Sequence, residues 1–143
     1  MKKAVVPRSL AVVVVVATLA PVASGMGAVG RWSSISPKLV GNWTRTVSRA
    51  DVKRSGATGI PAGSVWTLKI KKDGTASVFG TKGVGGFDGT VTSTGADRVH
   101  INLGIPSANT YVWDVSKQLL TLKKVKDPIQ DRVAVFVGIW KQK

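Results

Sequence analysis

The chain after Pro37 is a series of short segments in which hydrophobic and polar residues alternate. The clearest case is residues 65–71, where Trp66, Leu68 and Ile70 fall on one side of an extended chain and polar residues fall on the other. Alternation with a period of two predicts β-strands that bury one face. We expect eight such strands, over residues 39–47, 65–71, 75–79, 87–93, 98–103, 110–115, 119–125 and 132–140.

Turn-forming residues separate these segments. Asp73-Gly74 predicts a tight hairpin, because glycine accepts the positive φ that such a turn requires. We expect a glycine-rich turn over residues 80–86 and a long polar loop over residues 48–63. All seven acidic residues are aspartate, which favours turns, and glutamate, a good helix former, is absent. The composition therefore argues against amphipathic helices.

The number and spacing of the strands favour an all-β fold. Eight short strands with hairpin-length connections are typical of a sandwich or an up-and-down barrel, and closing the barrel removes exposed strand edges. Residues 127–131 predict one helical turn, with Asp127 as its N-cap and Pro128 at its first position. We therefore predict an eight-stranded antiparallel up-and-down barrel with one short helical turn before the last strand.

The first 28 residues have the pattern of a secretory signal peptide. Two lysines and an arginine precede an apolar run over residues 10–20, and small residues follow Pro21. That run is shorter than the roughly 20 residues that span a bilayer as a helix, although a retained anchor is the alternative. We predict a signal peptide over 1–28, a linker over 29–37 and a barrel domain over 38–143. The expected location is secreted or extracytoplasmic, by a bacterial Sec-type route, with no transmembrane segment in the mature protein.

Charge and cysteine content narrow the picture further. The chain has 21 Lys and Arg against seven acidic residues, for a net charge of +14, and no cysteine. Without cysteine there is no lipid-modified cysteine anchor, disulfide framework or thiolate metal site. The excess positive charge has two possible roles: it keeps the protein surface solvated, or it attracts anionic surfaces and protein partners. The surface lysines that we expect to contribute are Lys69, Lys71, Lys72, Lys123, Lys124 and Lys126.

Three sequence segments resemble the calycin superfamily, which contains the lipocalins and secreted bacterial lipocalin-like domains. They are Leu39-Val-Gly-Asn-Trp43, Tyr111-Val-Trp-Asp-Val115 with Leu119-Leu-Thr-Leu122, and Asp127-Pro-Ile-Gln-Asp-Arg132 running into Val137-Gly-Ile-Trp140. The resemblance implies that Trp43, in the Gly-x-Trp signature that begins at Gly41, plugs one end of the barrel. It also implies that Arg132 packs over this indole, in a structural role.

Several residues are predicted to face the barrel interior, either filling a solid core or lining a cavity for an apolar or aromatic ligand. Arg45 shares strand parity with Trp43 and would point inward, where it could bind a ligand carboxylate or phosphate. The alternatives for Arg45 are pairing with an aspartate or a place at the open rim. The ligand-cavity candidates are Arg45, Trp66, Leu68, Phe87, Ile101, Tyr111, Trp113 and Phe136.

Residues suited to catalysis are few. His100 is the only histidine and falls on the outer face of a predicted strand, where we expect it to be solvated. No spacing supports a triad, and no His/Cys metal site can be assembled. Gly83-Val-Gly-Gly86 precedes no helix, so it does not predict a phosphate-binding loop. We expect no catalytic residue, metal or cofactor.

These observations predict a secreted, non-enzymatic binding protein that holds a small hydrophobic or amphipathic ligand inside a β-barrel. One alternative is a protein-interaction module such as a protease inhibitor, acting through a loop or residues 29–38. Another is a basic protein that binds anionic cell-surface polymers. Specific nucleic-acid binding is not expected, because the aromatic side chains are predicted to face inward rather than lie among the basic residues. An enzyme is the reading that the residues support least.

Overall fold

A computed structural model describes residues 35–143, which form eight strands and two short helices. The predicted signal peptide over 1–28 and most of the predicted linker over 29–37 lie outside the described residues. No helix among the described residues has the length and apolar character that crossing a membrane requires. The elements are β1 Gly41–Thr46, α1 Arg49–Ser55, β2 Val65–Ile70, β3 Thr75–Gly80, β4 Gly86–Ser93, β5 Arg98–Leu103, β6 Thr110–Ser116, β7 Leu119–Lys126, α2 Gln130–Phe136 and β8 Gly138–Gln142.

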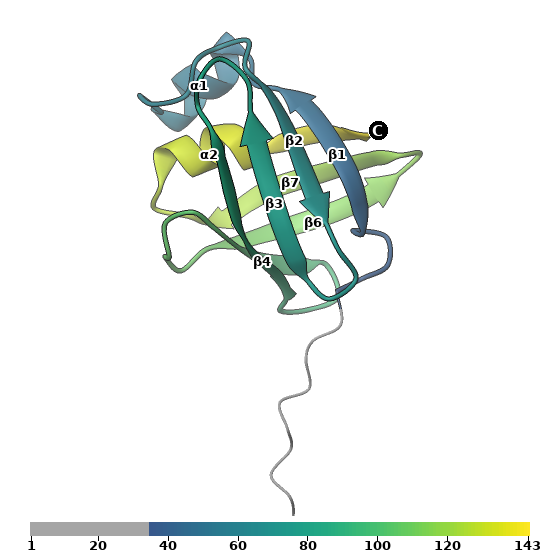
Figure 1. The fold of residues 1–143 in the computed structure, drawn as a ribbon. Coiled ribbons are helices and arrows are strands. Elements are labelled where there is room, and N and C mark those ends of the chain that lie inside the picture. Colours follow the sequence, from purple (N-terminus) through teal and green to yellow (C-terminus); the bar gives the residue numbers. More distant parts are fainter. Residues whose placement is uncertain (1–34) are drawn as a thin grey trace, which may run out of the picture. The chain divides into compact units, whose positions relative to one another are not determined.

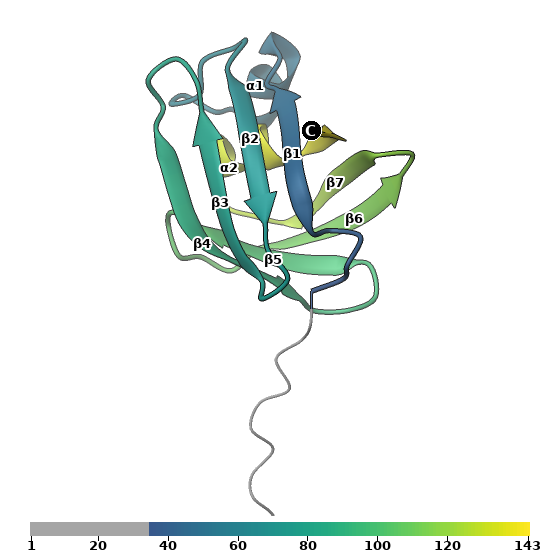
Figure 2. The ribbon, with the colours of Figure 1, turned by 45° about the vertical axis from the view of Figure 1, so that its right-hand side comes forward.

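The strands form a closed barrel in which each strand pairs with the next along the chain and β8 pairs with β1 (Figures 1 and 2). All eight pairings are antiparallel. In β2, Trp66, Leu68 and Ile70 are buried, while Lys69 is exposed, as the alternation predicts. The predicted fold class, an up-and-down antiparallel barrel with a short helix before the last strand, is confirmed.

The predicted loop over residues 48–63 contains a helix, α1. Ser48 caps it, since its hydroxyl accepts a hydrogen bond from the Asp51 amide at 3.1 Å and the Asp51 carboxylate accepts one from the Ser48 amide at 2.9 Å. Gly56 ends it with a left-handed φ of 73°. This capping box satisfies amide groups that an uncapped helix leaves free, which explains why a segment without glutamate is helical.

The predicted last strand over residues 132–140 is also wrong. Residues 130–136 form α2, and the strand is confined to β8. The N-cap position is Ile129, which makes no side-chain cap, although the predicted cap Asp127 still accepts a hydrogen bond from the Ile129 amide at 2.9 Å. Every residue from Arg132 to Phe136 is buried, so burial of the helix on several sides outweighs the strand preference of its valines.

Both helices lie at the same end of the barrel, where β1 and β7 end and where α1 packs against α2 (Figures 1 and 2). At the other end, the segment before β1 contributes the buried side chains of Ile35 and Leu39. The indole Nε1 of Trp43 donates to the Leu39 carbonyl at 2.9 Å. Trp43 therefore anchors the N-terminal segment to the end opposite the helices.

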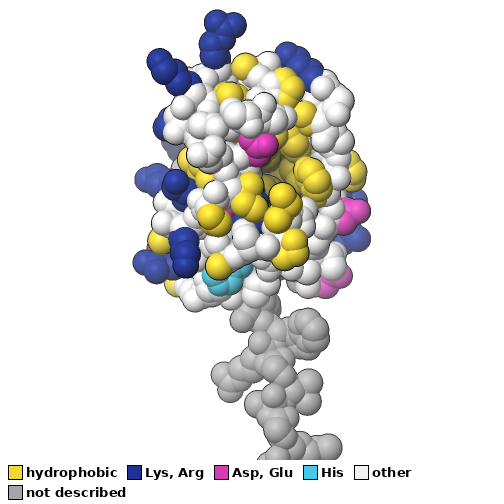
Figure 3. Space-filling model, turned by 90° about the vertical axis from the view of Figure 1, so that its left-hand side faces the viewer, with side chains coloured by type: hydrophobic (Ala, Val, Ile, Leu, Met, Phe, Trp, Pro, Cys, Tyr) yellow, Lys and Arg dark blue, Asp and Glu magenta, His cyan; other side chains and the backbone are white. Residues whose placement is uncertain are grey.

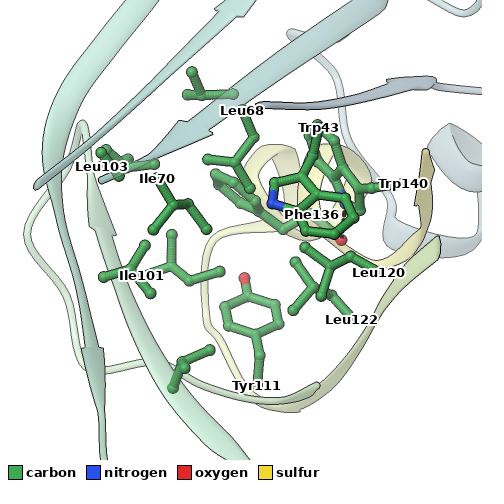
Figure 4. Packing of buried hydrophobic residues seen from close by; sticks show 14 of the residues in the cluster. Trp43, Leu68, Ile70, Ile101, Leu103, Tyr111, Leu120, Leu122, Phe136 and Trp140 are labelled. Atoms are coloured by element: carbon green, nitrogen blue, oxygen red, sulfur yellow. Dashed lines mark hydrogen bonds between the residues drawn. The ribbon is translucent and has the colours of Figure 1, made fainter. Parts of the chain in front are cut away.

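A single hydrophobic cluster fills the interior of the barrel between these ends. Trp43, Trp66, Tyr111 and Trp140 are at most 1% exposed and belong to this cluster. Figure 4 shows the labelled side chains converging on one another from opposite walls. Of the two arrangements that the sequence left open, the centre of the barrel has the filled core, and the open space lies elsewhere.

Candidate functional site

A pocket of about 350 Å³ opens at the helical end of the barrel. Trp66, Val78 and Phe136 form its deep part and are almost fully buried. Phe87 and Ile105 stand at its rim, 45% and 65% exposed. Figure 3 shows the face on which hydrophobic side chains gather around a hollow, with Lys and Arg mainly at the margin of the view. The pocket is therefore an extension of the core that reaches solvent.

The strand register explains why Phe87 reaches the rim. Phe87 pairs with Val78, whose side chain is buried inside the barrel, so Phe87 has the inward parity that the sequence predicts. It is the second residue of β4, however, and lies at the mouth rather than within the wall. Its ring rests on Gly104, where a Cβ would approach the ring to 3.1 Å and where φ is 76°. Phe87 was predicted to be an interior residue, but its side chain is partly exposed, because β4 begins where the barrel opens.

Arg132 lies in the pocket wall, but its guanidinium is occupied by internal partners. Its Nε and Nη2 donate to the Asp127 carboxylate at 2.6 and 2.8 Å, and its Nη1 donates to the Ile105 carbonyl at 2.9 Å. Its Nη2 also donates to the Ser107 hydroxyl. The Tyr111 hydroxyl donates to the same Asp127 carboxylate. This cluster ties α2 to β6 and to the loop that follows β5.

The pKa values of the cluster follow from these contacts. Burial acts to raise the pKa of Asp127, but hydrogen bonds from Arg132 and Tyr111 outweigh it, so the pKa lies below its usual value. Burial also acts to lower the pKa of Arg132, and Asp127 reverses that effect. For Tyr111, burial and then the hydrogen bond to Asp127 both raise the pKa well above its usual value. The cluster thus holds one negative and one positive charge at neutral pH.

Arg45 is buried in β1, and both of its terminal guanidinium nitrogens bind groups within the protein, while its Nε has no hydrogen-bond partner. Its Nη2 pairs with the Asp51 carboxylate at 2.8 Å, and its Nη1 donates to the carbonyls of Val135, at 2.9 Å, and Val137. Burial lowers the pKa of Arg45, and Asp51 offsets part of that shift. Arg45 does not line the pocket, so the suggested ligand-anion role is not supported, whereas the alternative of pairing with an aspartate is confirmed.

The predicted guanidinium–indole pair forms between other residues. The guanidinium carbon of Arg45 lies 5.8 Å from the ring centroid of Trp140. Gly138 permits this arrangement, since a Cβ there would lie 2.7 Å from the Arg45 guanidinium. Within residues 35–143 no such contact joins Arg132 to Trp43, because Asp127 holds the Arg132 side chain. The expected pairing of Trp43 with Arg132 is therefore wrong.

Apart from Arg45, the structure divides the ligand-cavity candidates into two groups. Trp66, Phe87 and Phe136 line the pocket. Leu68, Ile101 and Tyr111 lie in the filled core, and Trp113 is partly buried against it. Apart from Phe136, the pocket residues that come from loops and from α2 were not predicted as cavity candidates, and they include Ile60, Val84, Ile105, Ile129 and Asp131. Only Ile105 carried a signal, as an apolar residue between Gly104 and Pro106 in a turn.

His100 is half-buried rather than fully solvated, and its Nδ1 contacts the Asn109 carbonyl. No hydrogen bond in the described part of the chain joins His100 to a serine or a carboxylate. The same residues contain no cluster of three or more His, Cys, Asp or Glu side chains that could hold a metal ion. The geometry around His100 therefore offers no triad.

Comparisons with known proteins add no assignment, since no protein-family profile matches the chain and no curated protein sequence is significantly similar to it. The pocket is therefore interpreted from its own geometry.

Proposed function

We propose that this protein is a non-enzymatic binding protein that takes a small apolar or amphipathic ligand into the pocket at the helical end of the barrel. The observation that carries the proposal is the pocket itself, about 350 Å³ in volume, with hydrophobic side chains from its deep part to its rim. This volume falls within the range of about 300–1,000 Å³ typical of small-molecule sites. The ligand would sit above the filled core rather than along the barrel axis.

The exposed rim supports this interpretation. Phe87 is 45% exposed, which leaves roughly 70–110 Å² of its surface in water. A ligand that covered half of that area would gain about 1 kcal/mol from this side chain, or about fivefold in affinity. Ile105 and Val84 would contribute in the same way. Bound ligand would thus cover apolar surface that the protein alone leaves in contact with water.

The test is fluorescence titration with N-phenyl-1-naphthylamine, a neutral apolar probe. We expect saturable binding that Phe87→Asp weakens at least fivefold, since a carboxylate at the rim must be desolvated as well. Phe79→Asp is the matched control, because Phe79 is 54% exposed on the outer face of β3 and does not line the pocket. Absence of saturable binding, or equal effects of the two variants, would refute the proposal.

We further propose that the protein is exported and is a calycin-like relative of the bacterial lipocalin-like domains. The signal-peptide pattern of residues 1–28 and the closed eight-stranded barrel support this. Expression of the full chain in a bacterium tests export: the processed protein, identified by N-terminal sequencing, should appear outside the cytoplasm. Recovery of the uncleaved chain from the cytoplasm alone would contradict it. Inhibition of proteases through residues 29–38 stays an untested prediction.

A second function, binding of anionic polymers, is favoured by the strand register. Asn42 of β1 pairs with Lys69 of β2, Thr44 pairs with Lys141 of β8, and the Lys143 amide donates to the Asn42 carbonyl. Exposed lysines of β2 and β8, the two strands that flank β1, therefore share one outer face. Salt-dependent retention on heparin that falls in Lys69→Gln/Lys141→Gln, but not in Lys53→Gln on α1, would support this function. Equal retention of all variants would refute it.

A further inference from the structure

We propose that the pocket prefers ligands that carry a cationic head, such as an alkylammonium group, on an apolar body, and that Asp131 is the counter-ion. This inference rests on the proposed function, because it names the class of ligand that the same pocket takes. It differs from the sequence-based hypothesis, in which an arginine would bind a ligand anion.

Asp131 lies in the first turn of α2 and lines the pocket. Its Oδ1 accepts hydrogen bonds from the backbone amides of Thr58 and Gly59 at 3.0 and 3.2 Å. Its Oδ2 would lie only 2.5 Å from a Cβ on residue 59, so glycine at this position leaves room for the carboxylate. The carboxylate is therefore held in one place beside the pocket by bonds to only one of its oxygens.

The second oxygen, Oδ2, has no hydrogen bond and no ion pair within residues 35–143. Five aspartates in the described part of the chain form no salt bridge, and among these five Asp131 is the one that lines the pocket. Asp51 and Asp127 illustrate the contrast, since each forms a salt bridge with a buried arginine. Asp131 thus presents an unpaired negative charge at the edge of an apolar pocket.

The cations near the pocket are committed elsewhere. The Arg132 guanidinium donates to Asp127, Ser107 and the Ile105 carbonyl. The Lys82 ammonium donates a hydrogen bond to the Ala62 carbonyl at 3.0 Å, and Lys82 does not line the pocket although its neighbour Gly83 does. Since Asp127 neutralises Arg132, the charge that remains among the lining residues is that of Asp131. A ligand carboxylate would meet this charge with no free cation in the wall, whereas an ammonium group would be attracted to it.

The attraction between an ammonium group and a partly exposed carboxylate is moderate. At a separation of about 4 Å near a protein surface, it corresponds to about a fivefold to tenfold gain in affinity at physiological salt. The apolar body would supply most of the binding, and the head group would supply the selectivity between charge classes.

Displacement of N-phenyl-1-naphthylamine by decylamine, decanol and decanoate tests the inference, with each competitor below its aggregation threshold, at pH 7 and 0.15 M salt. Decylamine is protonated under these conditions, like a lysine side chain. We expect half-displacement at a concentration about tenfold lower for decylamine than for decanoate, with decanol between them.

Asp131→Asn should abolish this preference, so that decylamine and decanoate displace the probe from the variant at similar concentrations. The asparagine retains an amide oxygen that can accept from Thr58 and Gly59. Asp114→Asn, at an exposed position of β6 outside the pocket, is the matched control and should retain the preference. Equal or better displacement by decanoate, or a preference that survives in Asp131→Asn, would overturn the inference while leaving the pocket intact. Failure of the neutral probe to bind the unmodified protein would instead overturn the proposed function, and this inference with it.

Discussion

Replacing Asp127 by asparagine should lower the free energy of unfolding by about 3 kcal/mol at pH 7. The Asp127 carboxylate is fully buried and accepts hydrogen bonds from Arg132, from the Tyr111 hydroxyl and from the Ile129 amide. Asparagine keeps one acceptor oxygen but presents an NH₂ group to donors and leaves the Arg132 charge without its counter-ion. For a barrel of this size, the loss corresponds to a decrease in Tm of roughly 12 °C.

The effect of the substitution should depend on pH in a defined direction. Because the pKa of Asp127 is lower in the folded protein than its ordinary value of about 3.9, the carboxylate stabilises the fold above that value. This stabilisation is lost as the pH falls through the folded-state pKa. Asparagine does not titrate, so the difference between the two proteins should be largest near pH 7 and should shrink below about pH 4.

Urea denaturation followed by tryptophan fluorescence at pH 7 and pH 3 measures both quantities. Tyr111→Phe should lower stability by about 1.5 kcal/mol alone, and the double variant should show coupling of about 1 kcal/mol with Asp127→Asn. Asp114→Asn, exposed on β6, should change stability by less than about 0.5 kcal/mol. A loss below 1 kcal/mol for Asp127→Asn at pH 7, or a difference that does not narrow in acid, would show that this carboxylate does not hold the cluster together.

Three further substitutions probe other contacts. Arg45→Met should lower the free energy of unfolding in urea by about 3 kcal/mol, because two backbone carbonyls and a carboxylate lose their donor; a change within error would contradict that role. Ser48→Ala should lower the Tm by about 4 °C, since removing an N-cap costs about 1 kcal/mol, and an unchanged Tm would show that α1 does not depend on its cap. Gly89→Ala should disrupt the pairing of β4 with β5, because its Cβ would lie 1.9 Å from the Asn102 carbonyl oxygen. Amide exchange should then accelerate in both strands, whereas Gly95→Ala, whose Cβ has room, should leave exchange unchanged.

The strands could be predicted because each carries its own alternation. The predicted residues 65–71 and 75–79 differ from β2 and β3 by one residue at one end. In these strands buried and more exposed side chains alternate, so the order of residue types in the sequence indicates which side chains are buried. Closure into a barrel could also be predicted from the sequence, because hairpin-length connections leave few other ways to cover the strand edges.

The helices could not be predicted from alternation. Ser48 and Asp51 have the spacing of a capping box and Gly56 has the place of a C-terminal glycine, so α1 had local signals that the absence of glutamate outweighed in the prediction. The segment from Arg132 to Phe136 has the valine content of a strand, and its helical state depends on contacts with distant residues. Pairwise contacts such as Arg45 with Trp140 depend on that helix and were therefore missed as well.

The pocket was missed in part for the same reason. Trp66 and Phe87 come from strands and were predicted as cavity residues, whereas Asp131 and Ile129 come from α2 and its N-terminal boundary. Ile129 and Asp131 fell in the predicted helical turn over residues 127–131, whose place against the barrel was not predicted. The candidate site could thus be predicted only as far as the strands that form its floor.

The pairing of β1 with β8 means that the fold is completed only when the two ends of the domain meet. β8 begins at Gly138 and ends at Gln142, almost a hundred residues after β1. During synthesis, β1 therefore lacks its second neighbour until the residues of β8 have been made. Such sequence-distant pairing slows folding and leaves the nascent chain open for longer. Deleting residues 138–142 would expose unpaired edges on both β1 and β7, so it would open the whole barrel rather than remove one strand.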